Sequence, residues 1–248
     1  MKLCLLLVAI LAALPLPGLS GLNQRLLVVS FDGFRQLYFK DRFLPWFSEF
    51  RKHGLYSDQV QSIFPSETFP NHFSIVTGMY AESHGIIGNR MYDPFLGETF
   101  HKSDNSPKWW ASTGAEPIWV TAERQGKRVS VQFWPGSAVL YPPGNFTPSY
   151  YRAVYDTSVP LEARIDETIH HLENSDIQLA FIYYHQPDVD GHANGAPSTN
   201  VEETLKQTDW YLSYLMKRLN EVNLGKDQFN VVICADHGIF SLKKPNFL

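Results

Sequence analysis

Three short segments of the sequence carry side chains that could bind a divalent metal ion. Asp32 follows an apolar run, Asp188 and His192 lie four residues apart, and Asp236 and His237 are adjacent after another apolar run. Carboxylate oxygens and imidazole nitrogens are common zinc ligands. Adjacent ligand-type side chains at the end of a buried strand are hard to explain by packing, because charges are rarely buried unpaired. Considered alone, a tight turn at Asp32 and a solvated turn at Asp188 remain alternatives.

A hydroxyl nucleophile is the second chemical feature that the sequence suggests. Thr68 lies in the stretch PSETFPNHFSIVTGMYAESHGIIGN, residues 65–89. Pro70 favours the first turn of a helix, so Thr68 is expected just ahead of a helix N-terminus. Unpaired N–H groups and the helix dipole favour negative charge there, which suits an alkoxide beside an anionic substrate. An ordinary N-cap is the alternative, and Thr68 alone does not separate the two interpretations.

The elements that must position these side chains follow from the pattern of apolar residues. Short apolar runs predict strands, and apolar residues three or four apart predict helices. Strands that alternate with helices predict an α/β fold with a mostly parallel sheet covered by helices on both faces. The expected strands cover residues 25–31, 128–133, 178–184 and 229–234, and the expected helices cover 43–53, 70–77, 117–125, 161–172 and 200–222.

Three of the predicted strands end at the polar clusters. The first leads to Asp32, the third to the segment with Asp188 and His192, and the last to Asp236 and His237. In open α/β sheets the binding crevice lies at the carboxyl ends of the strands. We therefore expect these side chains to gather in one crevice.

Other segments are expected to be irregular or to mark helix ends. Residues 80–116 are polar and aromatic with many turn-forming residues, which predicts a long irregular segment. Pro187 and Gly191 predict that residues 188–192 form a loop and not a helix. Thr199 and Glu202 have the spacing of a capping box at the start of the last helix.

Composition predicts a packed globular domain and argues against one class of partner. Of 248 residues, 44% are hydrophobic and 14% aromatic, which is ample for a core and excludes a disordered chain. The net charge is −4, from 21 basic and 25 acidic residues, and no basic run is present. Binding to the backbone of a polymeric nucleic acid is therefore not expected.

The N-terminus predicts a secretory route. Residues 1–20 combine Lys2, an apolar run and small residues before a cleavage point, as in a signal peptide. The catalytic core is expected over residues 21–240 and an atypical tail over 241–248. No later stretch predicts a transmembrane helix, so the mature chain is expected to be secreted or lumenal. Asn145 begins an Asn-Phe-Thr glycosylation sequon in a stretch that reads as a surface loop.

These motifs resemble the ectonucleotide pyrophosphatase/phosphodiesterase family, which belongs to the alkaline-phosphatase-like metalloenzymes. The similar segments run in the family's order from about residue 25 to residue 240. They are VVSFDGFR, SETFPNHFSIVTG, ESHGIIGN, PIWVTAERQG, FWPGS, PDVDGH and ICADHG.

The resemblance implies two zinc ions and a covalent mechanism. One zinc would be held by Asp32, Thr68, Asp236 and His237; the other would be held by Asp188, His192 and a further histidine. Thr68 would attack phosphorus and form a phospho-threonine that water then hydrolyses. Asn89 and the Thr68 backbone N–H would hold a non-bridging oxygen. A nucleotide base would stack between Phe69 and Tyr155, with Trp134 nearby.

The sequence departs from the family pattern at three places. Glu67 stands where many members have lysine, and an anion beside the nucleophile should repel a phosphate. Ala138 stands where nucleotide-cleaving relatives often have aspartate. The chain also ends at Leu248, before the position of the family's last zinc histidine, so the second site lacks one of its usual ligands.

Several functions therefore stay open at this level. The first is a secreted, zinc-dependent phosphodiesterase or nucleotide pyrophosphatase acting on a small nucleotide or phosphodiester. The second is a truncated, catalytically impaired chain that acts without chemistry. A phospholipid-type enzyme acting on choline phosphodiesters is a further alternative. A sulfatase-like relative is weaker, because such enzymes use a modified cysteine and Cys234 is in the wrong place.

Overall fold

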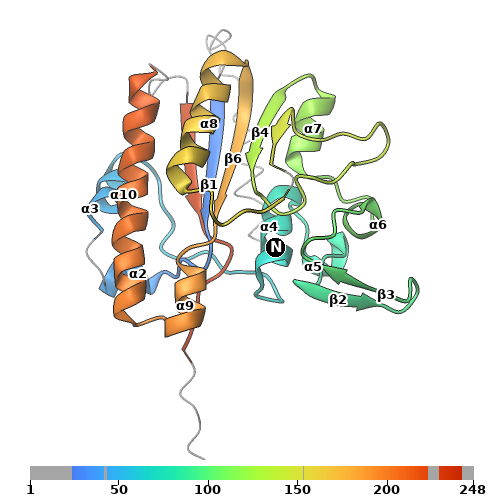
Figure 1. Ribbon diagram of the computed structural model, residues 1–248, viewed down its shortest axis with the longest axis horizontal. Coiled ribbons are helices and arrows are strands. Elements are labelled where there is room, and N and C mark those ends of the chain that lie inside the picture. The colour runs from blue at the N-terminus through green and yellow to red at the C-terminus, as the bar shows by residue number, and fades with distance from the viewer. Residues whose placement is uncertain (1–23, 42–43, 153, 223–228, 242–248) are drawn as a thin grey trace, which may run out of the picture.

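A computed structural model of the chain describes residues 24–41, 44–152, 154–222 and 229–241 (Figure 1). The expected signal segment, residues 1–20, and residues 242–248 of the expected tail lie outside the described residues. Within the described part, no helix has the length and apolar character needed to cross a bilayer.

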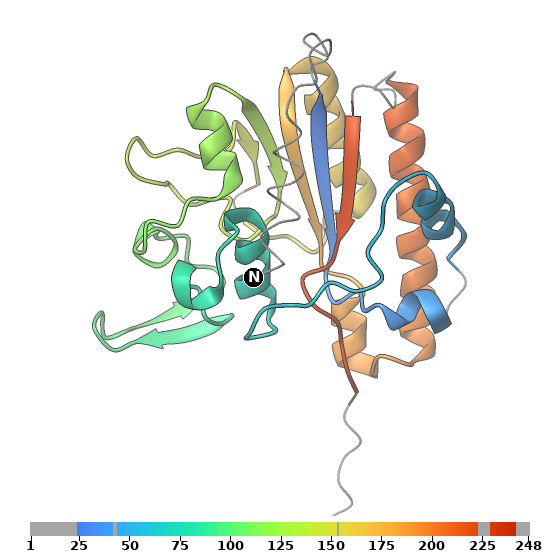
Figure 2. The same cartoon turned by 180° about the vertical axis from the view of Figure 1, so that it is seen from behind.

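A five-stranded sheet forms the centre of the fold, and all its paired strands are parallel. The order is β5-β4-β6-β1-β7, and from behind, the blue strand β1 runs between gold β6 and red β7 (Figure 2). This arrangement confirms the predicted parallel sheet. The strands are β1 (Arg25–Phe31), β4 (Arg128–Gln132), β5 (Tyr150–Tyr151), β6 (Ile177–Tyr184) and β7 (Phe229–Cys234).

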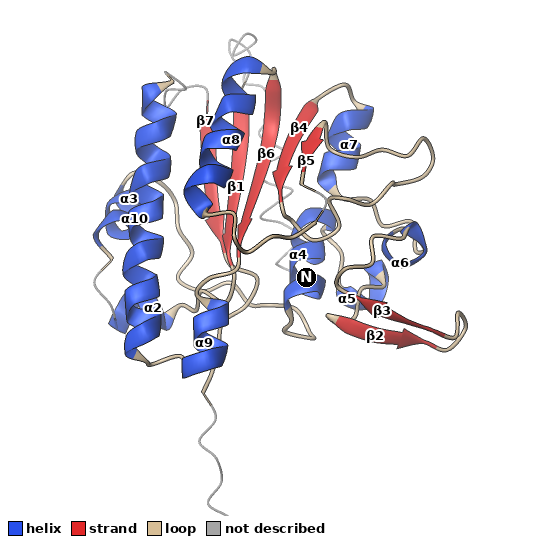
Figure 3. Ribbon diagram, in the orientation of Figure 1, coloured by secondary structure: helices blue, strands red, loops and turns tan. Residues whose placement is uncertain are grey.

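Helices cover both faces of the sheet, as expected from the sequence (Figure 3). One face packs against α2 (Leu37–Asp41), α3 (Pro45–Lys52), α8 (Leu161–Asn174) and α10 (Thr199–Glu221), and the other against α4 (Thr68–Thr77) and α7 (Ile118–Arg124). Strand β1 contributes Leu27 and Val29 to the first core and Val28 to the second. A strand buried on both faces explains why its sequence is a continuous apolar run.

The long helix α10 shows how a predicted amphipathic helix is held in place. Its buried stripe packs on the sheet, while Ser198 caps its start by accepting the Val201 N–H at 3.3 Å. The cap is therefore Ser198, one residue before the predicted Thr199. In mid-helix, buried Asp209 accepts the N–H groups of Trp46 and Phe47 at the start of α3. A carboxylate at a helix N-terminus satisfies unpaired donors there.

The segment 80–116 is more ordered than predicted. It contains α5 (Ala81–His84), an antiparallel pair of β2 (Arg90–Asp93) and β3 (Glu98–His101), and α6 (Pro107–Trp110). Trp109 and Trp110 are buried, and their indole N–H groups donate to the side-chain and main-chain oxygens of Asp104. Burial of these two indoles against the α4 side of the core orders a segment whose polar composition indicates a loop.

Residues 188–192 lie in a helix, which corrects the prediction of a loop. Helix α9 spans Asp188–Asn194. Gly191 was interpreted as a turn residue, but a Cβ atom there would lie 2.4 Å from Cδ1 of Ile239. The glycine therefore allows close packing between α9 and the chain after β7, which the sequence pattern does not reveal.

Arg164 on α8 is a charged side chain inside the fold. It is fully buried, and its guanidinium donates to the carbonyl oxygens of Val159, Asp156 and Tyr183 at 2.8–3.1 Å. The cation also lies 4.5 Å from the ring centroid of Phe133. Arg164 thus ties the end of β6 to the loop that precedes α8.

We expect Arg164→Met to lower the free energy of unfolding by about 3 kcal/mol, because buried carbonyl groups lose a charged donor. The matched control is Arg90→Met, at an exposed arginine on β2, with a change below about 0.5 kcal/mol. Urea denaturation followed by tryptophan fluorescence measures both. Equal stability losses for the two variants would contradict the role given to Arg164.

Candidate metal and nucleophile site

The carboxyl ends of β1, β6 and β7 meet at one end of the sheet, as predicted. The Asp188 N–H donates to the Asp32 main-chain oxygen at 3.0 Å, which joins the segments after β6 and β1. The Gly33 N–H donates to Asp236 Oδ1 at 3.1 Å, which joins the segments after β1 and β7. Two main-chain donors therefore bring the three acidic segments together.

Gly33 is needed for this approach. Its φ is +68°, a left-handed conformation that glycine adopts without strain. A Cβ atom at this position would lie 2.9 Å from the Cα, Cβ and Oδ1 atoms of Asp188. Both the backbone conformation and the space therefore require glycine, which confirms a turn at Asp32-Gly33 and leaves the ligand role of Asp32 as a prediction.

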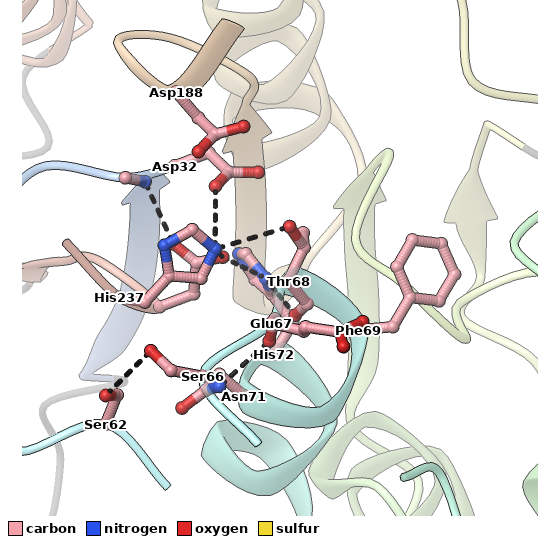
Figure 4. A network of polar contacts seen from close by, with 12 residues as sticks. Asp32, Ser62, Ser66, Glu67, Thr68, Phe69, Asn71, His72, Asp188 and His237 are labelled. Carbon is pink, nitrogen blue, oxygen red and sulfur yellow. Dashed lines mark hydrogen bonds and ion pairs between the residues drawn. The ribbon is translucent and has the colours of Figure 1, made fainter. Parts of the chain in front are cut away.

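Asp32, Asp236 and His237 form a compact group with metal-ligand chemistry. One ligand atom from each lies within 4.8 Å of the others. His237 Nε2 is 3.2 Å from Asp236 Oδ2 and 3.6 Å from Asp32 Oδ1 (Figure 4). His237 Nδ1 lies 3.2 Å from the Gly238 carbonyl oxygen, which can only accept. In the tautomer with its proton on Nδ1, this contact is a hydrogen bond, and the Nε2 lone pair can bind a metal ion.

The carboxylate oxygens at this point fit a cation. Asp32 Oδ1, Asp188 Oδ1 and Asp236 Oδ2 are buried and accept no hydrogen bond from the described residues. The other carboxylate oxygen of Asp32 and of Asp236 already accepts a hydrogen bond. Tyr183 donates to Asp32 Oδ2 at 2.6 Å, and the Gly33 N–H donates to Asp236 Oδ1. Buried carboxylate oxygens without donors are costly unless they bind a metal ion or become protonated.

The pKa values of Asp32 and Asp236 are raised, as expected for buried carboxyl groups whose negative charge is not compensated. Burial raises the pKa of Asp32 well above its usual range, and the charge of Asp236 raises it further. Burial also raises the pKa of Asp236 to about 7. A divalent cation would oppose both increases, because its charge favours the ionised carboxylates.

Thr68 lies beside this group. It is the first residue of α4, not a residue ahead of the helix, and the N-cap position belongs to Glu67. The Thr68 hydroxyl lies 3.5 Å from His237 Nε2. Within the described part of the chain, this hydroxyl caps no main-chain N–H. The geometry therefore favours a chemical role for the hydroxyl over the N-cap alternative.

His72 is a site residue that the sequence reasoning missed. Its Nδ1 lies 2.8 Å from the Thr68 carbonyl oxygen and 3.4 Å from Asp236 Oδ2, and its Nε2 lies 2.9 Å from Ser30 Oγ. Burial lowers the pKa of His72 to about 4, so the ring is neutral and donates from Nδ1. His72 thereby links β1, α4 and the end of β7. Its spacing of four residues from Thr68 places both on one helix face and was the available signal.

Asn89 also approaches the start of α4. Its Oδ1 accepts the Phe69 N–H at 2.8 Å. Neither the Thr68 N–H nor Asn89 Nδ2 has an acceptor among the residues that the structure describes. Two donors without an acceptor thus remain at the start of α4, where a substrate oxygen could accept from them.

The second expected metal pair lies on α9, and its Asp188 adjoins the compact group through the hydrogen bond to the Asp32 main-chain oxygen. Asp188 Oδ1 and His192 Nε2 lie 3.4 Å apart on consecutive turns of α9. The His192 side chain is 74% exposed, whereas the Asp188 side chain is 15% exposed. The helix brings the pair together, and it leaves one of its two potential ligands open to solvent.

The three aromatic residues expected at the substrate differ in exposure. Phe69 packs beside Phe100 and Trp110 and is half-buried, and Tyr155 is 41% exposed with its hydroxyl 2.6 Å from His185 Nδ1. Trp134 is 2% exposed and donates to the His72 carbonyl oxygen at 3.1 Å. Trp134 therefore packs behind α4, and its expected place near the substrate stays a prediction.

Comparisons with known proteins identify a family that the chain resembles over most of its length. The family model for type I phosphodiesterase/nucleotide pyrophosphatase matches residues 26–248. Bis(5'-adenosyl)-triphosphatase enpp4 of Xenopus laevis is 41% identical over 220 residues, which are 88% of this chain and 47% of that protein. Human ectonucleotide pyrophosphatase/phosphodiesterase family member 1 is 39% identical over 221 residues, or 86% of this chain and 23% of that protein. The chain thus spans half or less of these relatives.

Solved structures show the same fold. An inactive variant of murine ectonucleotide pyrophosphatase/phosphodiesterase 5 in complex with AMP superposes with a TM-score of 0.80 at 36% identity. The match covers 87% of this chain and 57% of the murine chain. The human protein of the same name gives a TM-score of 0.81 at 34% identity. On the family match and this shared fold, the chain belongs to the type I phosphodiesterase/nucleotide pyrophosphatase family.

Proposed function

We propose that this chain carries the nucleophile and most of the metal ligands of a zinc-dependent phosphodiesterase that hydrolyses phosphodiester or pyrophosphate bonds in nucleotides. The observation that carries the proposal is the Thr68 hydroxyl at the start of α4, 3.5 Å from the histidine of the buried carboxylate group. A hydroxyl beside unshielded acidic and imidazole ligands suits metal-assisted attack on phosphorus.

The first zinc would be held by Asp32, Thr68, Asp236 and His237. Three of these residues already have converging ligand atoms, and two of the carboxylates have an oxygen without a donor. Asp188 and His192 would supply ligands to the second zinc. When bound, zinc lowers the pKa of a coordinated hydroxyl and stabilises negative charge on a phosphoryl group.

The chain's own residues perform the transfer. The Thr68 hydroxyl gives its proton to solvent, its oxygen bonds to phosphorus, and the bond from phosphorus to the leaving group breaks, so that the leaving group departs as an anion that solvent can protonate. Water then cleaves the phospho-threonine and restores the hydroxyl. The Thr68 N–H and Asn89 Nδ2 donate to a non-bridging oxygen during both steps, because these donors have no acceptor in the described protein.

A nucleotide is the substrate class that the available aromatic surfaces favour. Phe69 and Tyr155 keep part of their rings exposed, which a base could contact, while Trp134 supports α4 from behind. The name of the frog relative describes a dinucleoside triphosphatase, and the murine relative was solved with AMP. Among the described residues, no specific contact favours a choline phosphodiester or a sulfate ester.

A second candidate is a chain that binds metal without turnover. Asp188 and His192 supply two protein ligands to the second ion, whereas catalytic zinc usually has three. The exposure of His192 favours this candidate as well, since no element among the residues that the structure describes encloses that side chain. Turnover by the isolated chain distinguishes the two functions.

Entry into the secretory pathway forms part of the proposal. It rests on the signal-like segment at residues 1–20 and on the position of Asn145. Asn145 is exposed in a turn between the paired residues Tyr141 and Phe146, with φ of 56°. An exposed sequon in a turn is open to a glycan.

We expect Thr68→Ala to lower the turnover of bis(p-nitrophenyl) phosphate at alkaline pH by about a thousandfold or more, because the nucleophile is lost. Thr68→Ser should keep part of the rate. The free energy of unfolding, measured by thermal denaturation, should change by less than about 0.5 kcal/mol, since the hydroxyl caps no N–H. The matched control is Thr77→Ala in the last turn of α4, which should retain the rate. Unchanged turnover in Thr68→Ala would contradict the assignment.

We expect the zinc-free chain to bind at least one zinc, and Asp236→Asn to weaken that affinity by about tenfold or more, because a neutral amide is a poor replacement for a carboxylate ligand. Asp58→Asn, at an exposed carboxylate after α3, serves as the control with unchanged affinity. Competition with a chromogenic chelator measures both. The metal assignment fails if both variants bind zinc as the parent does.

A further inference from the structure

Two hydrogen bonds run in opposite directions between the start of α4 and the segment around Asn89. The Asn89 N–H donates to Glu67 Oε2 at 2.7 Å, and the Phe69 N–H donates to Asn89 Oδ1 at 2.8 Å. Glu67 and Phe69 flank Thr68 on either side. The nucleophile thus lies between the two residues that hold Asn89.

The second of these bonds orients the Asn89 amide. Because Oδ1 accepts from the helix, the amide cannot turn over without losing this bond, and its Nδ2 is the group left for another partner. Asn89 also serves as an external cap of α4, since the N-cap residue Glu67 makes no side-chain bond to its own helix. The same bond therefore caps the helix and fixes the orientation of the donor.

The first bond depends on a carboxylate whose own backbone is fixed. The Glu67 N–H donates to the Pro65 oxygen at 2.9 Å, and the Glu67 oxygen accepts Asn71 Nδ2 at 2.8 Å. Asn71 is buried, and its Oδ1 accepts the Ile63 N–H at 2.8 Å. These hydrogen bonds fix the main chain on both sides of Glu67. They therefore define the direction in which the Glu67 side chain leaves the turn. Figure 4 shows Glu67, Thr68 and Asn71 together at this turn.

We propose that Glu67 is a positioning residue that, through the main-chain N–H of Asn89, holds the Asn89 amide in register with the Thr68 hydroxyl. The inference rests on the proposed function and deepens it by assigning a role to a residue with an unfavourable charge. A free carboxylate beside the nucleophile would repel an anionic substrate. At this site the carboxylate instead accepts a main-chain N–H at the positive end of a helix, where its charge is favourable.

Positioning and repulsion predict opposite kinetic effects of the same substitutions. If Glu67 positions Asn89, removing its acceptor lowers kcat, and a neutral acceptor of the same shape restores the rate. If Glu67 mainly repels phosphate, then removing its charge lowers KM and leaves kcat unchanged or raised. Glu67→Ala removes the acceptor and the charge, whereas Glu67→Gln removes the charge alone.

We expect Glu67→Ala to lower kcat for bis(p-nitrophenyl) phosphate by about tenfold or more, with KM changed by less than about threefold, because a misplaced donor weakens the transition state. Glu67→Gln should recover most of kcat. The control Glu82→Ala removes an exposed carboxylate on α5 and should leave both constants unchanged. A Glu67→Ala enzyme with undiminished kcat, or with a lower KM as its main change, would overturn the proposal.

A double-mutant cycle tests whether Glu67 acts through Asn89. Asn89→Ala removes the donor itself, so Glu67→Ala should lower kcat by less than about threefold in that background. Independent, additive losses from the two substitutions would show that Glu67 acts by another route.

A measurement without turnover separates this inference from the proposed function. In the chain labelled with ¹⁵N-asparagine, the Asn89 amide proton should be shifted downfield and protected from hydrogen exchange by its bond to Glu67. Glu67→Ala should remove the shift and the protection, and Glu67→Gln should keep most of both. An Asn89 amide that does not respond to Glu67→Ala overturns the proposal even in an active chain. If the parent chain has no turnover, the proposed function fails while this experiment still decides the contact.

Discussion

The structure depends on the burial of carboxylates at the ends of its central strands. Asp32 and Asp236 are 2% and 3% exposed, and each has one oxygen without a hydrogen-bond donor among the described residues. An uncompensated charge is costly in a protein interior, so neighbouring groups must lower that cost. Tyr183 donates to Asp32 Oδ2 and Gly33 donates to Asp236 Oδ1. The other two oxygens, Asp32 Oδ1 and Asp236 Oδ2, have no donor among the described residues and could bind a cation.

Helix α4 brings the Thr68 hydroxyl, the proposed nucleophile, close to these carboxylates, and it is held by side-chain contacts more than by its own length. Ten residues form a marginal helix in water, so tertiary contacts must supply most of its stability. His72 ties the helix to β1 and approaches Asp236, Asn71 fastens the preceding turn, and Asn89 caps its start. All of these contacts lie at or near the first turn of α4, which carries Thr68. The placement of the Thr68 hydroxyl and the stability of the helix are therefore linked.

The two expected metal sites differ in how well the described residues enclose their side chains. The group of Asp32, Asp236 and His237 is enclosed and backed by donors, whereas His192 extends into solvent from α9. The curated relatives are about twice as long as the matched segment or longer. The structure thus shows an enclosed group beside the Thr68 hydroxyl and a more exposed pair on α9, which are the two metal sites of the proposed function.

The sequence alone determined the parallel sheet, the helices on both faces and the identity of the acidic and histidine clusters. These features are local, because strand runs, helix periodicity and strand-end positions can be read from neighbouring residues. Only the tertiary structure decided what each side chain contacts. Gly191 signalled a turn yet lies in a helix packed on Ile239. The spacing of His72 from Thr68 indicated a shared helix face, but only the folded chain brings His72 to Ser30 and Asp236. The charge of Glu67 predicted repulsion of a phosphate, but in the fold its carboxylate accepts the main-chain N–H of Asn89. This contact spans 22 residues, so no local sequence pattern reveals it.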